Sequence, residues 1–282
     1  MDDKYTKVIA ANIQVHSKLA SFYEKTEPHF RAENIAIVDA RLKRVVDDTN
    51  AENLLDLGCG TGFMINIAKK HVKRIVGVDV TRAMLDRVDT SGPAKIELKE
   101  HDTGSVDVPP GSFDVVTAYS FLHHLYETKP TLGTAAKALK KGGKLYADLD
   151  PNFYFWQAVT QLEGRGTYDP MVQREIDAVA HRDKQIADEY GIPQDVFNDA
   201  EYGKTTAGGF EDARLRAELA EVGFTDVQFS FYWFLGQAFL VNEEGVERQR
   251  RLENAAKMDE VLQRLMPMSR HLYKYIGFVA TK

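Results

Sequence analysis

The stretch Leu54-Leu55-Asp56-Leu57-Gly58-Cys59-Gly60-Thr61-Gly62-Phe63 decides the fold of this chain. Its apolar residues 54–57 predict a short buried strand, and residues 64–70 predict the start of a helix. The alternate glycines between them permit a sharp backbone turn and a close approach by a ligand. A strand that enters a helix through such a turn is typical of the nucleotide-binding element of a doubly wound α/β sheet.

The spacing of these glycines excludes two classes of nucleotide-binding protein. A dinucleotide fold needs G-x-G-x-x-G, whereas the third glycine here comes one residue early. A phosphate-binding Walker loop needs Lys and then Ser or Thr after its last glycine, and Phe63-Met64 stands there instead. The glycine spacing therefore argues against a nicotinamide-dependent oxidoreductase.

Five blocks along the chain resemble, in order and spacing, the class I S-adenosylmethionine-dependent methyltransferases. The first is the glycine turn, Asp56 to Gly62. Residues 75–79 resemble the family's second strand, and residues 80–85 resemble the helix start that covers the adenine. Residues 112–116 resemble its fourth strand, and residues 139–145 the turn into its fifth. The resemblance implies a doubly wound, seven-stranded Rossmann-like sheet that binds S-adenosylmethionine and releases S-adenosylhomocysteine.

The resemblance also implies contacts to this cofactor. In the family, the acid at the end of the second strand holds the ribose hydroxyls (here Asp79), and an acid after the third strand binds the adenine amino group. Asp102 has that position, although it is equally placed to be a turn residue before Gly104. Asp56 is expected to brace the glycine turn by hydrogen bonds. The expected cofactor-binding residues are Tyr23, Arg31, Asp56, Gly58, Cys59, Gly60, Gly62, Asp79, Val80, Met84, Asp102, Thr103 and Tyr119.

Two helices are predicted in residues 6–48, with a break at Pro28. The segment between them resembles the part of small-molecule methyltransferases that folds over the cofactor, usually around Ala-x-x-Tyr. The resemblance implies that Tyr23 contacts the methionine part of the cofactor and that Arg31 contacts its carboxylate. Alternatively, the aromatic residues of this segment have only a structural role and pack the two helices against the core. We expect residues 1–49 to form a helical cap and residues 50–150 the cofactor-binding core.

The residues after the fourth strand are the candidates for catalysis, because ligands of such sheets bind outside the carboxyl ends of the strands. Methylases of exocyclic amines on DNA carry an Asn/Asp-Pro-Pro-aromatic motif here, which this chain lacks. The sequence Leu122-His123-His124-Leu125 instead resembles the quinone, sterol and natural-product branch of the family. A neutral imidazole can accept the proton of a hydroxyl or activated carbon as it is methylated.

The catalytic candidates are therefore His124, His123 and Asp150, with His124 as the general base. The alternative is that one histidine caps the strand and the other only packs. Asp150 either orients a histidine, binds substrate, or is a loop acid held by backbone amides. Asp148 precedes it on the same side of the fifth strand and is a further candidate.

Two stretches of the chain are longer than a minimal doubly wound fold requires. Residues 151–209 replace one expected helix and are predicted to form a helical lid over the substrate, with a loop at 202–209. A dimerisation cap with its own small core is the alternative. Residues 210–282 complete the sheet and carry a charged helical insertion at 242–266, in which Val246, Leu252 and Leu262 are expected to point inward. The candidate substrate contacts are Tyr154, Trp156, His181 and Tyr202.

Composition narrows the class of partner. The chain has 282 residues and a net charge of −6 with acids and bases interspersed, which disfavours a nucleic-acid or anionic-membrane surface. It starts without an apolar signal region, and its longest apolar run, 233–241, is too short to span a bilayer. The single cysteine excludes disulfides, cysteine-based zinc sites and the several thiolates of arsenite methylation. We expect a cytoplasmic enzyme with no metal, no nucleic-acid partner and no membrane partner.

Together these observations predict an S-adenosylmethionine-dependent methyltransferase. The expected acceptor is an oxygen or carbon atom, with nitrogen left open, of a small aromatic or apolar molecule. Methyl transfer is an in-line displacement, so alignment of the reacting atoms is the main task. The alternative is a non-catalytic S-adenosylmethionine-binding scaffold or partner protein. Charge disfavours a methylase of RNA or protein, and a homodimer through the two insertions is a further expectation.

Overall fold

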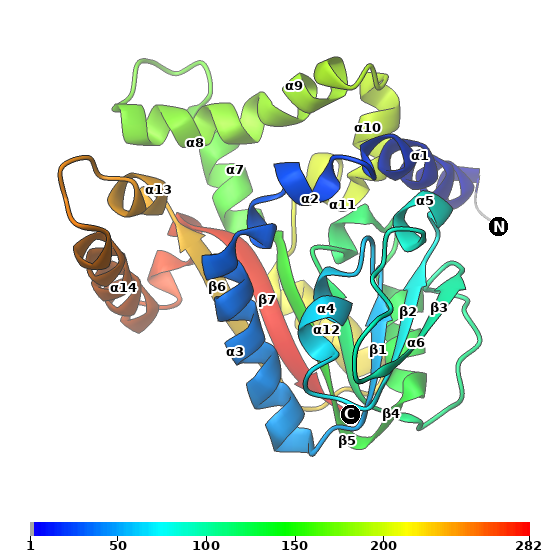
Figure 1. Cartoon of the computed structure of the whole chain (residues 1–282). Coiled ribbons are helices and arrows are strands. Elements are labelled where there is room, and N and C mark those ends of the chain that lie inside the picture. Colours follow the sequence, from blue (N-terminus) through cyan, green and yellow to red (C-terminus); the bar gives the residue numbers. More distant parts are fainter. Residues whose placement is uncertain (1–2) are drawn as a thin grey trace.

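The computed structural model describes residues 3–282, whose strands form one mixed sheet of seven (Figure 1). The spatial order is β3-β2-β1-β4-β5-β7-β6, parallel except for β7, which runs antiparallel to β5 and β6. This order confirms the predicted doubly wound sheet. The strands are β1 (Asn53–Leu57), β2 (Arg74–Asp79), β3 (Lys95–Glu100), β4 (Phe113–Tyr119), β5 (Leu139–Pro151), β6 (Val227–Phe234) and β7 (Tyr273–Thr281).

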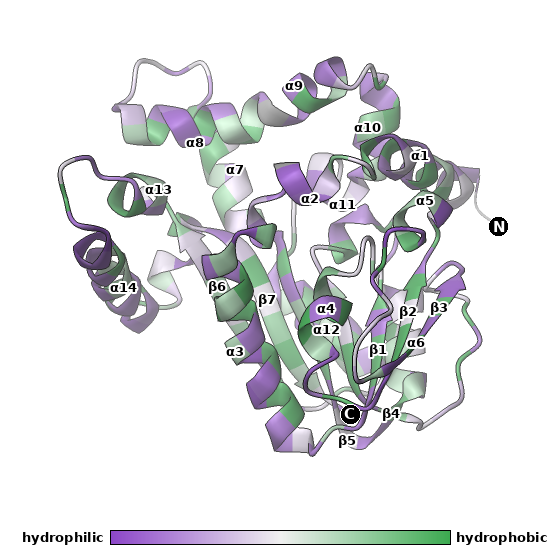
Figure 2. Cartoon of the chain, viewed as in Figure 1, coloured by the Kyte–Doolittle hydropathy of each residue, from purple (hydrophilic) through white to green (hydrophobic). Residues whose placement is uncertain are grey.

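Helices cover both faces of the sheet, which explains why the central strands read as continuous apolar runs. One face packs against α6 (Lys129–Ala138) and α12 (Asp212–Glu221). The other packs against α3 (Ala32–Thr49), α4 (Phe63–Ala68) and α5 (Arg82–Leu85). Figure 2 shows apolar strands between helices that alternate apolar and polar residues. This sandwich holds the carboxyl ends of β1, β2 and β4 at one edge.

The fifth strand starts earlier than predicted. Gly142 and Gly143 lie inside β5 rather than in a turn before it. Gly142 has a φ of +80°, and a Cβ at Gly143 would lie 2.9 Å from the carbonyl oxygen of Asp114. The register shifts at this point, between Phe113 and Val115. The two glycines therefore form an irregularity within the strand, where the neighbouring backbone comes too close for a side chain.

Two helical segments lie above the carboxyl ends of the parallel strands (Figure 1). The N-terminal cap comprises α1 (Asp3–Leu19), α2 (Tyr23–Thr26) and η1 (Pro28–Phe30). The lid, residues 151–209, is helical as predicted. Its helices are α7 (Phe153–Leu162), α8 (Pro170–Ala180), α9 (Arg182–Glu189), α10 (Gln194–Ala200) and α11 (Tyr202–Thr205).

The prediction of a loop at 202–209 is wrong for its first four residues, which form α11. The physical reason is close packing against the turn after β4. A Cβ at Gly203 would lie 2.8 Å from the Cα of His123, so glycine lets this helix lie directly on the histidine backbone.

The cap and the lid contact each other. Ala11 and Val15 of α1 pack with Phe197 and Ala200 of α10 in one apolar cluster. Lys4 forms an ion pair with Asp199 at the edge of this cluster. The two segments therefore form a joined cover over the edge of the sheet.

The second insertion, residues 242–266, contains α14 (Arg248–Arg264), with α13 (Gln237–Val241) before it and η3 (Met268–Leu272) after it (Figure 1). Leu252 is 38% exposed, so the expectation that it points inward is wrong. The expectation is confirmed for Leu262, which packs with buried Ala255 against the main apolar cluster, and Val246 is half-buried. Across residues 3–282, no helix combines the length and apolarity that a membrane span needs.

Candidate active site

An open cavity lies at the carboxyl ends of β1, β2 and β4, beneath α1 (Figure 1). Eleven of the thirteen expected cofactor-binding residues line it: Tyr23, Asp56, Gly58, Cys59, Gly60, Asp79, Val80, Met84, Asp102, Thr103 and Tyr119. The cap and the segment after β4 add lining residues that the sequence did not single out: Tyr5, Val8, Ile9, Asn12, His16, His29, Ser120, Phe121, Leu125 and Tyr126. The cavity thus combines the glycine turn with an apolar and aromatic wall.

Asp79 braces the glycine turn. Its Oδ2 accepts from the backbone N–H of Gly60 at 2.9 Å, and its Oδ1 accepts from that of Thr81 at 2.8 Å. Gly58, Gly60 and Gly62 all have positive φ, from +52° to +90°. A Cβ at Gly60 would meet nothing within 4 Å, so this part of the turn faces open space. The prediction that Asp56 braces the turn is wrong, because Asp79 makes those contacts.

Gly58 is required by packing as well as by its φ of +72°, because a Cβ there would lie 2.0 Å from Cδ2 of Phe121. We expect Gly58→Ala to destabilise the protein by about 2–4 kcal/mol, from backbone strain and overpacking. Urea unfolding measures this loss. Gly60→Ala is the matched control, because it has positive φ without a clash. Adding Phe121→Ala should recover part of the loss in Gly58→Ala; no recovery would show that the clash is not the cause.

Asp56 is buried at the end of β1 with one oxygen unpartnered. Its Oδ1 accepts from Oγ1 of Thr117 at 2.7 Å, whereas its Oδ2 has no hydrogen-bond partner in the part of the chain that the structure describes. Burial raises the pKa of this carboxyl to about 7, although the Thr117 bond opposes the shift. A buried, unsatisfied oxygen beside a cavity is a place for a donor group of a ligand.

The raised pKa of Asp56 predicts a pH-dependent stability. A carboxyl whose folded-state pKa is raised from 3.8 to about 7 stabilises the fold below pH 4 and loses that contribution as pH rises through 7. As pH rises from 5 to 8, we therefore expect the free energy of unfolding of the ligand-free wild type to fall by about 2–3 kcal/mol relative to that of Asp56→Asn. Urea unfolding at both pH values measures it, with exposed Asp86→Asn as control. Equal pH dependence of wild type and Asp56→Asn would contradict it.

Asp102 combines the two roles that the sequence left open. Its Oδ1 accepts from the backbone N–H of Gly104 at 3.1 Å, as a turn residue does. Its Oδ2 accepts from the hydroxyl of Tyr5 at 2.6 Å, and the residue lines the cavity. Tyr5 reaches it from the N-terminal cap, a contact that no local sequence pattern indicates.

Two expected cofactor residues lie outside the cavity lining. Arg31 is exposed at the start of α3, so the prediction that it contacts the cofactor is wrong. Gly62 is the N-cap of α4, and a Cβ there would lie 2.9 Å from Val88, so it shapes the turn from behind. The cap instead contributes His29, which is buried against Phe63. Burial lowers the pKa of His29 to about 4.

His124 is the catalytic candidate that lines the cavity. It ends the short helix η2 (Leu122–His124), which follows Ser120, a residue with a φ of +50°. Its Nδ1 lies 2.8 Å from the carbonyl oxygen of Ala200. A carbonyl only accepts, so Nδ1 carries the hydrogen and Nε2 carries the lone pair of the neutral ring. Burial lowers the pKa of His124 well below 6.5, so the imidazole is neutral at pH 7.

His123 and Asp150 lie behind His124 rather than in the cavity lining. Nδ1 of His123 is 2.8 Å from Oδ1 of Asp150, which also accepts from the backbone N–H of His123. Burial raises the pKa of Asp150 and lowers that of His123 to about 4. Two of the readings for Asp150 fit: it orients His123, and its carboxylate also accepts from a backbone amide. The structure does not place either residue where it contacts a ligand in the cavity.

Asp148 has a structural role. Its carboxylate accepts from Arg41 at 2.9 Å and from the hydroxyl of Tyr146 at 2.7 Å. The guanidinium of Arg41 also lies 3.6 Å from the ring centroid of Tyr232. These contacts join α3 to β5 and β6, away from the cavity.

Three of the four candidate substrate residues lie elsewhere: Tyr154 and Trp156 because α7 packs toward β7 and η3, and His181 because it is exposed at the end of α8. The hydroxyl of Tyr154 donates to Asp212, and Nε1 of Trp156 donates to the carbonyl of Lys274. Tyr202 alone approaches the site. Its ring meets that of Tyr126 edge-to-face at 5.1 Å, and it lines a neighbouring cavity that shares Leu125 and Tyr126.

Residues 55–147 match the family model described as a methyltransferase domain. This part of the chain, from β1 into β5, is a methyltransferase domain, and the chain resembles the class I S-adenosylmethionine-dependent methyltransferases. It is 27% identical over 256 residues to the nocamycin O-methyltransferase of Saccharothrix syringae, covering 86% of this chain and 88% of that protein. It is 30% identical over 116 residues to the ubiquinone biosynthesis O-methyltransferase of Idiomarina loihiensis, covering 39% of this chain and 47% of that protein.

The fold of this methyltransferase is similar to that of solved structures. A S-adenosylmethionine-dependent methyltransferase from Archaeoglobus fulgidus superposes with a TM-score of 0.54 at 18% identity, covering 93% of this chain and 100% of that one. Several curated relatives match only over about half of their length.

The residues of the cavity fit S-adenosylmethionine, the cofactor of this family. The turn at Gly60 leaves open space for a ligand, and Oδ2 of Asp56 lacks a donor. The Asp79 carboxylate beside them would hold the ribose hydroxyls, and Asp102 the adenine amino group. Asp56 would receive a donor of the methionine part.

Proposed function

We propose that this methyltransferase moves a methyl group to an oxygen or carbon atom of a small aromatic or apolar molecule, with nitrogen as the less favoured acceptor. One observation carries the proposal. His124, with its Nδ1–H held by Ala200 and its Nε2 bearing a lone pair, lines the same cavity as Asp79 and the glycine turn. A base and a cofactor site in one cavity support catalysis over the non-catalytic scaffold.

The bound cofactor supplies an electrophilic methyl group on a sulfonium centre. The task of the chain is to align the acceptor with it and to remove the acceptor's proton. Nε2 of His124 accepts that proton, because burial keeps the ring neutral at pH 7. Helix α1 of the cap lines one side of the cavity, and the lid supports this helix through α10.

The lining of the cavity supports an apolar or aromatic acceptor. Val8 and Ile9 from α1 face the cavity together with Phe121, Leu125 and Tyr126 from the segment after β4. Such surfaces bind a flat apolar ring, and a hydroxyl on that ring would present its proton to His124. Two relatives with O-methyltransferase in their names support oxygen as the acceptor atom.

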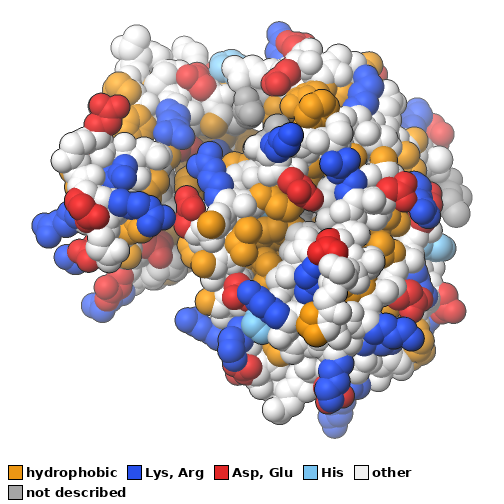
Figure 3. Space-filling model, viewed as in Figure 1, with side chains coloured by type: hydrophobic (Ala, Val, Ile, Leu, Met, Phe, Trp, Pro, Cys, Tyr) orange, Lys and Arg blue, Asp and Glu red, His pale blue; other side chains and the backbone are white. Residues whose placement is uncertain are grey.

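Surface charge supports a small molecule over RNA. The net charge is −6, and the face in Figure 3 shows Lys and Arg interspersed with Asp and Glu around a central apolar area. An RNA-binding surface would gather basic residues on one side.

The test has two stages. Calorimetry should detect micromolar or tighter binding of S-adenosylhomocysteine. A screen with radiolabelled S-adenosylmethionine and hydroxylated aromatic, quinol and polyketide-like molecules should then find an acceptor. Binding without any transfer would support the scaffold instead, and no binding would overturn the proposal. Sedimentation of the same sample tests the homodimer, which stays a prediction.

A further inference from the structure

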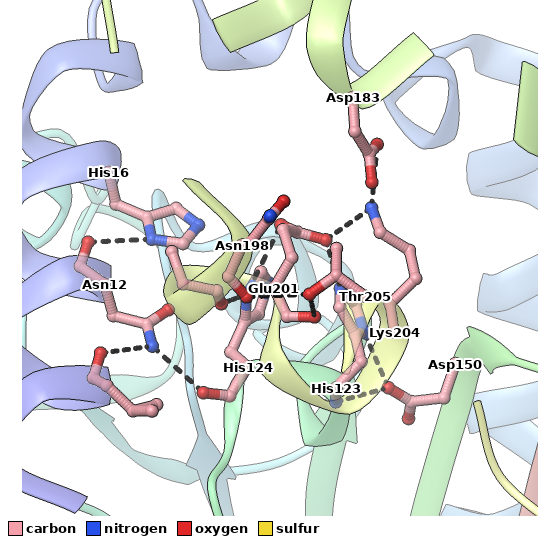
Figure 4. Close-up of polar contacts among 12 residues, drawn as sticks. Asn12, His16, His123, His124, Asp150, Asp183, Asn198, Glu201, Lys204 and Thr205 are labelled. Atoms are coloured by element: carbon pink, nitrogen blue, oxygen red, sulfur yellow. Dashed lines mark hydrogen bonds and ion pairs between the residues drawn. The ribbon is translucent and has the colours of Figure 1, made fainter. Parts of the chain in front are cut away.

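Glu201, in the lid, has a carboxylate within 4 Å of both His123 and His124 (Figure 4). It follows α10 and is 8% exposed. Its Oε1 lies 3.5 Å from Nδ1 of His124, and its Oε2 lies 3.7 Å from Nε2 of His123. No sequence pattern links Glu201 to these histidines, because the whole lid separates them in the chain.

The ring of His124 is restrained on several sides. Its Nδ1–H faces two acceptors, the Ala200 carbonyl at 2.8 Å and the Glu201 carboxylate at 3.5 Å. The ring of His16, from α1, meets it edge-to-face with centroids 4.7 Å apart. Nδ2 of Asn12 donates to the backbone carbonyl of His124. Both acceptors fix the hydrogen on Nδ1, which leaves Nε2 as the basic atom.

Glu201 is held as an anion. Burial alone would raise the pKa of its carboxyl, but the cationic Lys204 and the two histidines outweigh burial and hold it below its usual value. Nζ of Lys204 lies 2.5 Å from Oε2 of Glu201 and 3.0 Å from Oδ1 of Asp183. The groups that face His124 are thus His123, His16 and Glu201, with Lys204 and Asp183 behind Glu201 (Figure 4).

We propose that Glu201 is a positioning residue, delivered by the lid, that holds His124 in its Nδ1–H form and stabilises the imidazolium that forms in catalysis. The inference rests on the proposed function, because it assigns that imidazolium to a methyl-transfer step. In this step the acceptor oxygen forms a bond to the methyl carbon, and the carbon–sulfur bond breaks. Nε2 of His124 gains the proton that the acceptor loses. Glu201 stays ionised throughout, and its negative charge lies next to the new positive charge.

A metal centre is the rival explanation of the same cluster. Ligand atoms of His123, His124 and Glu201 all lie within 4.8 Å of one another. However, Lys204 already pairs with Oε2 of Glu201, and the His124 nitrogen nearest to Glu201 donates to Ala200. These partners compete with a cation for Oε2 of Glu201 and Nδ1 of His124, so the contacts favour an ion-pair network.

The test compares two variants that both lack the Lys204 ammonium, which pairs with Glu201 in the wild type. These variants are Lys204→Met and Lys204→Met/Glu201→Gln. Each is labelled with ¹⁵N-histidine, saturated with S-adenosylhomocysteine and titrated by NMR, with the His124 signals assigned by their loss in His124→Asn. We expect both variants to show the Nδ1–H form. We expect the proton affinity of His124 to be about tenfold higher where Glu201 is retained, because an adjacent anion favours the charged ring.

Equal proton affinity in the two variants would overturn the proposal and leave Glu201 only as the partner of Lys204. Broadening of both histidine signals of the wild type at one equivalent of Zn²⁺ would also overturn it, in favour of a metal centre. If Lys204→Met does not bind S-adenosylhomocysteine, wild type and Glu201→Gln are compared instead, with a lower affinity expected in Glu201→Gln. The NMR result needs no turnover. Failure of the acceptor screen is therefore distinguishable from failure of this coupling.

Discussion

Replacing Asp79 by alanine is expected to weaken the binding of S-adenosylhomocysteine at least about 100-fold. The carboxylate is the only side chain that holds the Gly60 and Thr81 backbone N–H groups among the described contacts, and it lies where the ribose hydroxyls would bind. Two hydrogen bonds to a charged group are worth about 3–6 kcal/mol together, and about 1.4 kcal/mol is a tenfold change in affinity. Isothermal titration calorimetry at pH 7.5 measures the loss.

Asp86→Ala is the matched control for Asp79→Ala. Asp86 is an exposed acid on the next turn of the same segment, paired with Arg82, so its loss should leave the affinity within about threefold, as surface changes usually do. Asp79→Asn retains one acceptor oxygen for the glycine turn and should bind with an intermediate affinity. If Asp79→Ala binds as tightly as the wild type, the ribose site lies elsewhere.

Replacing His124 by asparagine is expected to lower kcat about 10²- to 10⁴-fold, the usual worth of a general base. Asparagine can keep the donor to the Ala200 carbonyl, which is 2.8 Å from Nδ1 in the wild type, but it lacks the basic Nε2. The affinity for S-adenosylhomocysteine should therefore change little. Turnover of the acceptor found in the screen, at saturating concentrations of both substrates, measures kcat.

The pH profile provides a second readout for His124. Burial lowers its pKa well below 6.5, so the neutral base should persist through mildly acidic pH. We expect kcat of the wild type to be flat between pH 6 and pH 8 and to fall only at lower pH, as the ring gains a proton. His181→Asn, an exposed lid histidine, should match the wild type. Unchanged kcat in His124→Asn would exclude the base.

The cofactor site was largely predictable, because it depends on local sequence. The glycines at 58 and 60 and the acid that ends β2 belong to strand–turn units whose geometry neighbouring residues determine. Parallel strands then bring those turns to one edge of the sheet. The two failures at this site have local reasons too: Arg31 starts a helix whose first turn is exposed, and Gly62 is a helix cap rather than a lining residue.

The substrate side was predicted less well, because it depends on how distant helices pack. The aromatic residues of α7 were predicted to contact the substrate. Instead, Tyr154 donates a hydrogen bond to Asp212, and Trp156 donates one to the carbonyl of Lys274. Conversely, Tyr5 and His16 reach the cavity only because α1 packs against α10 and the strand ends.

The sequence by itself determined the class of fold, a doubly wound sheet, and the glycine turn followed by the acid Asp79, because short-range spacing and strand polarity suffice for them. Only the tertiary structure decided which histidine lines the cavity and which one Asp150 supports. It also brought Glu201 from the lid to within 3.5 Å of His124. Such contacts arise from the burial of long insertions against the core, and no local pattern of residues encodes where a distant side chain comes to rest.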